Sequence, residues 1–155
     1  MTILIFCFLI GAVTGLRSLT PAAIVCWAAR FGWLHFSGTH LAFIDRPATL
    51  VVFTLLAIVE LITDKLPMTP ARTSAPGLTA RIVFGGCCGA ALSVSAGVAL
   101  VAPLLAGVIG AVSGTFAGYN IRHALVNRAH LPDLLVALVE DLIAIGSGFL
   151  ILSHF

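Results

Sequence analysis

Residues 2–30 read TILIFCFLIGAVTGLRSLTPAAIVCWAAR, and this stretch decides the class of fold. It is apolar over more than the ~20 residues that a helix needs to cross the hydrocarbon layer of a membrane. Arg17, Ser18, Thr20 and Pro21 interrupt it in the middle. A proline inside a helix frees a backbone carbonyl, so we expect a kink or a break at this point. The stretch predicts a transmembrane helix that is not regular along its whole length.

The composition of the chain indicates that the bilayer is its solvent. Of 155 residues, 60% are hydrophobic and 9% are charged, whereas a soluble domain carries about 25% charged residues. The mean hydropathy is +1.15. We therefore expect one transmembrane domain over residues 1–155, with the lipid bilayer as its partner. The basic residues are scattered singly, which excludes nucleic acid as a predicted partner.

Four further helices are predicted, which makes five crossings of an all-α membrane protein. They cover residues 48–65, 79–101, 104–128 and 132–152. Residues 31–47 mix aromatic and charged side chains and suit an interfacial segment, whereas the proline-rich residues 66–78 are expected to form a polar loop.

The distribution of Lys and Arg predicts the orientation of these helices, because basic residues prefer cytoplasmic loops. With five crossings, the N-terminus shares a side with Lys65, Arg72, Arg81, Arg122 and Arg128, while Arg30 and Arg46 lie on the other side. The N-terminus is therefore expected in the cytoplasm. An extra half-crossing at Pro21 would weaken this argument, and the sequence leaves that alternative open.

Two pairs of segments match each other within the chain. GAVTG at residues 11–15 matches GAVSG at residues 110–114, and LLAIVE at residues 55–60 matches LVALVE at residues 135–140. The repeat copies would cover residues 2–65 and 104–153, joined by the loop 66–78 and the helix 79–101. Because three crossings separate the copies, they would run in opposite directions, as in the inverted repeats of many transporters. The alternative is that duplicated helices simply pack well.

Several ionisable and polar side chains lie within the predicted helices. A charged group inside a membrane costs about 2.5–3.5 kcal/mol on insertion scales, so such groups face the bundle interior and have partners. Arg17 is expected to pair with Glu60 or Glu140, because its guanidinium matches a carboxylate. The candidates for binding an ion or substrate are Arg17, Glu60, Asp64, Tyr119, Arg122, Glu140 and Asp141. The alternative is a structural ion pair that locks the bundle.

A second candidate site contains arginines and a hydroxyl group. Arg72, Thr73 and Arg81 flank the proline-rich loop. With Arg122 they could bind an anion such as a phosphate, because guanidinium groups suit that ligand. The alternative is that these arginines only mark the cytoplasmic interface.

Glycines at helical spacing predict close contacts between helices. Gly110, Gly114 and Gly118 share one face, and Gly11 and Gly15 form a shorter run. The same faces could hold two chains together. A bundle of five helices is also thin around a polar pathway, so we expect a homo-oligomer.

No catalytic residue or metal site is predicted. The chain has no Gly-x-Ser-x-Gly, His-Glu-x-x-His or phosphate-binding loop, and its four cysteines lie in apolar runs without metal-ligand spacing. The cofactor remains unknown, and an enzyme is less favoured than another function.

The chain also resembles a known family in four of its segments. These are GLRSLTPA at residues 15–22, VELITDKLPMTPAR at residues 59–72, GTFAGYNIRHAL at residues 114–125 and LVEDLIA at residues 138–144. They resemble an uncharacterised family of small bacterial membrane proteins, filed as a domain of unknown function. The resemblance covers nearly the whole chain and implies a location in the bacterial inner membrane, but no activity.

Three hypotheses follow. The leading one is a small transporter or channel-like protein for an ion or a small polar solute. The second is a membrane-embedded enzyme acting on a lipid or polyprenyl-phosphate headgroup, with the arginines holding phosphate and Glu140 or Asp141 as acid or base. The third is a non-catalytic assembly module.

Overall fold

The protein is all-helical in the parts that the computed structural model describes, which are residues 1–65, 73–128 and 130–155. The helices are α1 (Thr2–Leu16), α2 (Thr20–Arg30), the short 3-10 helix η1 (Ala42–Asp45), α3 (Pro47–Thr63), α4 (Ala75–Ser95), α5 (Val101–Asn127) and α6 (Asp133–Ser153). In these ranges α4, α5 and α6 are long and apolar enough to cross a membrane, and α1 and α3 are shorter apolar helices. This confirms the all-helical class and the membrane character.

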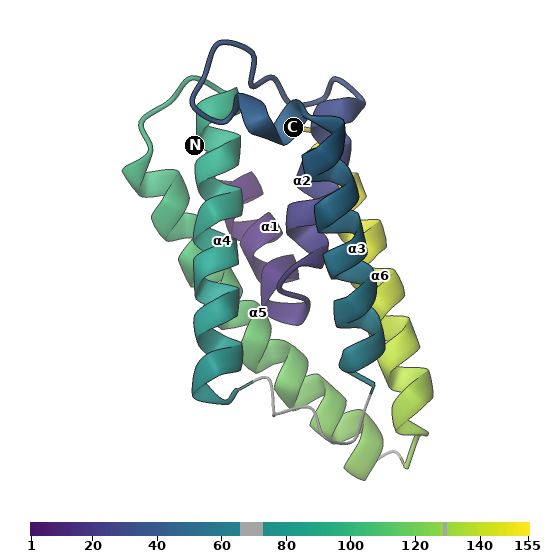
Figure 1. Cartoon of the computed structure of the whole chain (residues 1–155). Coiled ribbons are helices and arrows are strands. Elements are labelled where there is room, and N and C mark those ends of the chain that lie inside the picture. The colour runs from purple at the N-terminus through teal and green to yellow at the C-terminus, as the bar shows by residue number, and fades with distance from the viewer. Residues whose placement is uncertain (66–72, 129) are drawn as a thin grey trace.

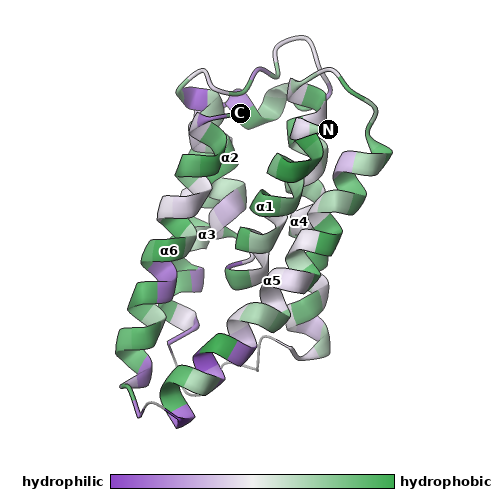
Figure 2. Ribbon diagram, turned by 180° about the vertical axis from the view of Figure 1, so that it is seen from behind, coloured by the Kyte–Doolittle hydropathy of each residue, from purple (hydrophilic) through white to green (hydrophobic). Residues whose placement is uncertain are grey.

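The outer surface of the bundle is apolar. Figure 2 shows hydrophobic residues along the outside of α5 and α6, with polar residues gathered where these helices meet. Leu142 and Leu150 of α6 are among the most exposed side chains, at 73% and 62%. Such a surface fits the interior of a lipid bilayer.

The helices α1 and α2 form a hairpin instead of one continuous crossing. Arg17 has an extended backbone, with φ −140° and ψ 121°, and it ends α1. Pro21 then lies in the first turn of α2, where its missing N–H costs nothing. Figure 1 shows that α2 turns back toward the end of the molecule where α1 begins. The interruption that the sequence predicted in residues 2–30 therefore reverses the chain, and the count of five crossings is not confirmed.

The two termini lie at the same end of the molecule. The rings of Phe6 and Phe155 meet edge to face with centroids 5.5 Å apart, and the backbone N–H of His35 donates to Ser95 Oγ at 2.9 Å. We call this the terminal end. The opposite end, where α3 stops, α4 starts and α5 and α6 meet, is the far end (Figure 1). Five crossings would have separated the termini.

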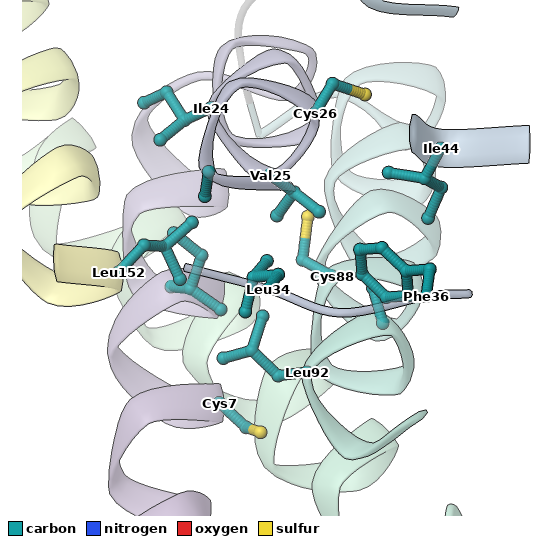
Figure 3. Close-up of a cluster of buried hydrophobic side chains, with 13 residues drawn as sticks. Cys7, Ile24, Val25, Cys26, Leu34, Phe36, Ile44, Cys88, Leu92 and Leu152 are labelled. Atoms are coloured by element: carbon teal, nitrogen blue, oxygen red, sulfur yellow. The ribbon is translucent and has the colours of Figure 1, made fainter. Parts of the chain in front are cut away.

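An apolar core closes the terminal end (Figure 3). Residues 31–46 do not only lie along an interface, because Leu34 and Phe36 from this segment point inward and are 2% and 0% exposed. They pack with Cys7 of α1, Val25 of α2 and Leu92 of α4, all of them buried. The segment therefore connects α2 to α3, and its buried side chains belong to the apolar core formed with α1, α2 and α4.

Glycines bring α1 and α5 into backbone contact. A Cβ added to Gly11 would lie 2.2 Å from the carbonyl oxygen of Gly107, and one added to Gly114 would lie 2.1 Å from that of Ala12. No side chain fits at such distances. The predicted glycine packing thus occurs within the chain, and these faces of α1 and α5 are filled without a second copy.

The inverted repeat is not confirmed by the directions of the helices. The contacts Phe8–Gly110 and Ala12–Gly114 advance along both helices together, and Figure 1 shows α1 and α5 both running from the terminal end toward the far end. In contrast, α3 runs toward the far end and α6 runs away from it. A rotation that superimposes α1 on α5 would therefore not also superimpose α3 on α6, as the two copies of a repeat require. The reason is the hairpin, which removes one of the crossings that an inverted repeat requires.

Candidate functional site at the tip of the helix hairpin

Arg17 lies at the tip of the α1–α2 hairpin and is completely buried. Its Nη1 pairs with Asp64 at the end of α3, and its Nη2 lies 2.6 Å from Asp141 Oδ1 in α6. Lys65 Nζ approaches the other oxygen of Asp141 at 2.7 Å. The hairpin tip is thus tied to α3 and α6 by ion pairs.

Glu60 does not pair with Arg17 but binds the start of α2. Its carboxylate accepts hydrogen bonds from the backbone N–H groups of Ser18 at 2.6 Å, Leu19 at 3.0 Å and Thr20 at 3.2 Å. These N–H groups have no partner inside the helix, and the helix dipole makes this end positive. A buried carboxylate is therefore well placed there. The expected Arg17–Glu60 pair is wrong because the reversal of the chain turns this helix end toward Glu60.

Arg81 of α4 binds the other broken helix end. Its Nε donates to the carbonyl oxygen of Gly15 at 3.1 Å, and its Nη1 donates to the carbonyl oxygen of Gly77 at 3.1 Å. Gly15 lies in the last turn of α1, where carbonyl groups lack helical partners and the dipole is negative. A cation and an anion thus stabilise the two helix ends that the break exposes.

Among the described residues, six ionisable side chains gather at this point, three of them basic and three acidic. The cations are Arg17, Lys65 and Arg81, and the anions are Glu60, Asp64 and Asp141; we call these six residues the tip cluster. Balanced pairing limits the cost of removing charges from water. Arg17 Nε is nevertheless buried without a hydrogen-bond partner in the described part of the chain.

A polar cavity of about 230 Å³ reaches the tip cluster between the end of α3 and the start of α4. We call it the tip cavity; its lining residues are Ser18, Glu60, Asp64, Ser74, Pro76, Gly77 and Arg81. The Ser74 hydroxyl is buried and has no hydrogen-bond partner among the described residues. The cavity therefore combines carboxylates, a guanidinium and a hydroxyl group.

Arg122 and Glu140 lie apart from this cavity. Arg122 donates two hydrogen bonds to Asp133, at 2.9 and 2.8 Å, and its Nη1 is 3.6 Å from Glu140 Oε2. Both residues line a mostly apolar cleft of about 210 Å³ between α5 and α6. Glu140 cannot reach Arg17 because it points away from its neighbour Asp141, about 100° around the helix.

The remaining predicted residues are not brought to the tip cavity. Tyr119 is 42% exposed and stacks near His123, with ring centroids 6.1 Å apart. Thr73 lies in the turn before α4 and does not line the cavity, and Arg72 lies outside the described residues. The anion site thus remains a prediction.

The sequence missed Lys65 as a member of the site. Lys65 follows Asp64 at the end of α3 and was counted only as a basic residue of a loop. Its Nζ also donates to the carbonyl oxygen of Leu61 at 3.0 Å, which turns the side chain back along the helix toward Asp141. Its adjacency to a membrane carboxylate was the signal that could have identified it.

Comparisons with other proteins identify the family but no activity. No curated protein and no solved structure matches the chain. The family model described as a domain of unknown function (DUF4126) matches residues 4–154, which confirms the resemblance seen in the sequence, and the chain belongs to that family.

Proposed function

We propose that this protein is a small membrane transporter or channel-like protein that moves an ion or a small polar solute through the tip cavity. The observation that carries the proposal is the helix hairpin, whose tip ends inside the molecule beside a polar cavity. Non-helical backbone at membrane depth occurs only where protein or a water-filled cavity surrounds it. Transporters commonly bind their substrates at such broken helices.

The arrangement in the membrane follows from the lengths of the helices. We place α3, α4, α5 and α6 across the bilayer and the α1–α2 hairpin within it as a re-entrant element. The 17 residues of α3 span about 26 Å, close to the hydrocarbon thickness. The four crossings then follow one another along the chain, and each is joined to the next by a short connection.

We place the far end in the cytoplasm of a bacterial cell, with the protein in the inner membrane. Lys65, Arg122 and Arg128 belong to the far end, whereas Arg30 and Arg46 belong to the terminal end. The preference of basic residues for the cytoplasm then puts both termini outside. This reverses the expected orientation of the N-terminus, because the hairpin returns the chain to the side where it began.

The two ends of the molecule differ in a way that suits controlled passage. The tip cavity lies at the far end, whereas the apolar core blocks the path from the hairpin to the terminal end (Figure 3). A solute that enters would compete for Asp64, whose side chain is 20% exposed. Loss of the Arg17–Asp64 pair would remove one of the links between the hairpin and α3 and leave the hydrogen bonds of Glu60, and movement of the hairpin about this remaining link would open the second half of the path.

The test is a flux measurement in proteoliposomes that contain the purified protein. The panel consists of Na⁺, K⁺, H⁺, Cl⁻ and phosphate, measured with ion-selective dyes or radiolabel. We expect flux of at least one of these species above protein-free liposomes, and its loss in Asp64→Asn. Asp45→Asn is the matched control, because Asp45 lies in η1 at the terminal end and does not line the cavity.

Two results would overturn the proposal. One is the absence of flux for the whole panel and for the amphiphile described below. The other is equal flux in the wild type and in Asp64→Asn, which would make the tip cluster purely structural.

The enzyme hypothesis gains no support from the geometry. It requires the arginines to hold one phosphate, but Arg81 lines the tip cavity between α3 and α4, and Arg122 lines the cleft between α5 and α6. Of the two candidate acids, Glu140 lines the cleft between α5 and α6, whereas Asp141 belongs to the tip cluster. In the described part of the chain, Arg81 and Arg122 therefore line two different cavities and do not converge on one phosphate.

A further inference from the structure

A second cavity lies closer to the terminal end than the tip cavity. It measures about 240 Å³ and lies between α2, α3, η1 and α4. We call it the apolar cavity; its lining residues are Ala22, Val25, Cys26, Leu41, Phe43, Ile44, Phe53, Phe84, Cys87, Cys88, Ala90 and Ala91. None of these side chains carries a charge, in contrast to the tip cavity.

The lining residues of the two cavities follow one another along the same face of α4. On α4, Gly77 and Arg81 of the tip cavity are followed by Phe84, Cys88 and Ala91 of the apolar cavity. Steps of three and four residues keep all five on one face of a helix. We call the two cavities together the groove, which follows α4 from the far end toward the terminal end.

The other two walls of the groove repeat this pattern. Ser18 of the tip cavity is followed by Ala22 and Val25 on the adjacent hairpin arm, and Glu60 lies seven residues from Phe53 on α3. In the described chain α3 packs on α2 and η1 rather than along α4. Figure 1 shows α1 and α2 behind α3 and α4, and Ala22, Val25 and Cys26 of α2 line the apolar cavity.

We propose that this groove binds one zwitterionic lipid, with its headgroup in the tip cavity and one acyl chain in the apolar cavity. The proposal rests on the proposed function, because it names the class of molecule that the tip cavity takes. A groove that is polar at one end, apolar at the other and open between two helices matches an amphiphile that enters sideways from the bilayer. Together the two cavities fall within the ~300–1,000 Å³ that is typical of small-molecule sites.

The charges of the site select a headgroup without net charge. Among the described residues the tip cluster contains three basic and three acidic groups, so a headgroup with a net charge would leave one of these charges uncompensated in a poorly solvated place. Asp64 offers a carboxylate to an ammonium group, and the unpartnered Ser74 hydroxyl offers a donor to a phosphate oxygen. Phosphatidylethanolamine carries both groups.

The binding experiment uses native mass spectrometry of the full chain in detergent. The protein is titrated with phosphatidylethanolamine, with phosphatidylglycerol of the same acyl chains, and with free phosphoethanolamine. We expect phosphatidylethanolamine to bind about tenfold more tightly than phosphatidylglycerol, and free phosphoethanolamine not to compete at equal concentration. Equal binding of both lipids, or full competition by the free headgroup, would overturn the proposal.

Two variants test the position of the lipid. Ala90→Trp fills the apolar cavity, and its matched control Val83→Trp adds the same side chain on the same helix at a residue that is 52% exposed and outside the groove. We expect Ala90→Trp to lose the bound lipid and Val83→Trp to keep it. Ser74→Glu places a negative charge beside the phosphate and should weaken binding even if Ala90→Trp fails to fold.

The outcomes separate this inference from the proposed function. The inference is overturned if a second copy of the chain occupies the groove in place of lipid. It is also overturned if none of the groove variants changes the binding of lipid. If wild-type liposomes pass one of the ions and Ala90→Trp keeps that flux while losing the lipid, the proposed function stands and the lipid is not its substrate. If the lipid binds as expected but neither ions nor the lipid cross the membrane, the proposed function fails and the site remains.

Discussion

At the scale of single residues, the buried Arg17 has the largest energetic consequence in the molecule. It is 0% exposed, and its charge is balanced by Asp64 and Asp141. Removing one partner of a buried ion pair costs about 3–5 kcal/mol, because the other charge remains without compensation. The same reasoning makes the loss partly reversible when the opposite charge is removed as well.

The first prediction concerns this charge balance. Arg17→Leu should lower the free energy of unfolding by about 3–5 kcal/mol, measured by SDS titration in mixed micelles. Arg17→Leu combined with Asp64→Asn should recover part of that loss. If the double variant is no more stable than the single one, Asp64 is not a partner of Arg17.

The second prediction concerns Glu60. Glu60→Ala leaves the N–H groups of Ser18, Leu19 and Thr20 without their acceptor, which should cost about 1.5–3 kcal/mol. Glu60→Gln keeps an acceptor oxygen and should cost less. Thermal unfolding in detergent provides the measurement, with Asp45→Asn as the control that should leave the melting temperature near that of the wild type. Equal losses in the Ala and Gln variants would contradict the role as a helix cap.

The charged residues of the site could be predicted from the sequence, but their partners could not. Arg17, Glu60, Asp64 and Asp141 were identified because ionised groups are rare inside membrane helices and need partners. The pairing depends on where the chain reverses. Glu60 and Asp64 lie about one helical turn apart on the same face of α3, so a shift by one turn or a reversal of direction exchanges them, and hydropathy carries no information on either.

At the scale of elements, the contact between α1 and α5 depends on having no side chain at four positions. Gly11, Gly15, Gly110 and Gly114 each place their Cα against the backbone of the other helix. Such contacts gain dispersion energy over many atoms. They also tolerate no enlargement, because backbone atoms cannot move aside as a flexible side chain can.

The third prediction compares two glycine substitutions. A Cβ at Gly114 would lie 2.1 Å from the carbonyl oxygen of Ala12, whereas one at Gly146 of α6 would meet nothing within 4 Å. Gly114→Ala should therefore destabilise the protein by about 1–3 kcal/mol or more. Gly146→Ala should be neutral or stabilise by up to about 1 kcal/mol, because alanine favours helix. Equal melting temperatures of the two variants would show that α1 and α5 do not approach this closely.

The helices themselves were predictable, but the hairpin was only partly so. The length of the apolar runs identified α3, α4, α5 and α6 to within a few residues, since hydropathy measures what a bilayer requires. Arg17 and Pro21 marked the break. Whether the chain continues or turns back after a break is decided by Glu60, Arg81 and the inserted residues Leu34 and Phe36, all of which are distant in sequence.

At the scale of the whole molecule, the hairpin returns the chain to the end where it began, so the proposed arrangement has an even number of complete crossings. The terminal end then holds both residue 1 and residue 155, consistent with the contact between Phe6 and Phe155. The sequence could not give this parity, because a half-depth hairpin and a kinked crossing have the same composition. In the proposed arrangement the hairpin also changes the side of the membrane that the N-terminus faces.

The fourth prediction tests this parity in bacterial cells. Green fluorescent protein, which fluoresces when it folds in the cytoplasm, and alkaline phosphatase, which is active outside it, are fused in turn to each terminus. We expect both termini to give phosphatase activity and little fluorescence. Opposite results at the two termini would restore a topology with an odd number of crossings.

The wide separation in sequence of the groups that hold Arg17 has a consequence for how the protein is made. Asp64 is synthesised soon after the hairpin, but Asp141 belongs to the last helix, α6. While the ribosome is still extending the chain, the hairpin cannot settle at its final depth, because its buried guanidinium has only one of its two carboxylate partners. The hairpin should therefore remain near the membrane surface, or in the shelter of an insertion factor, until α6 has emerged. Chains truncated before α6 should expose Arg17 to water and be selectively degraded.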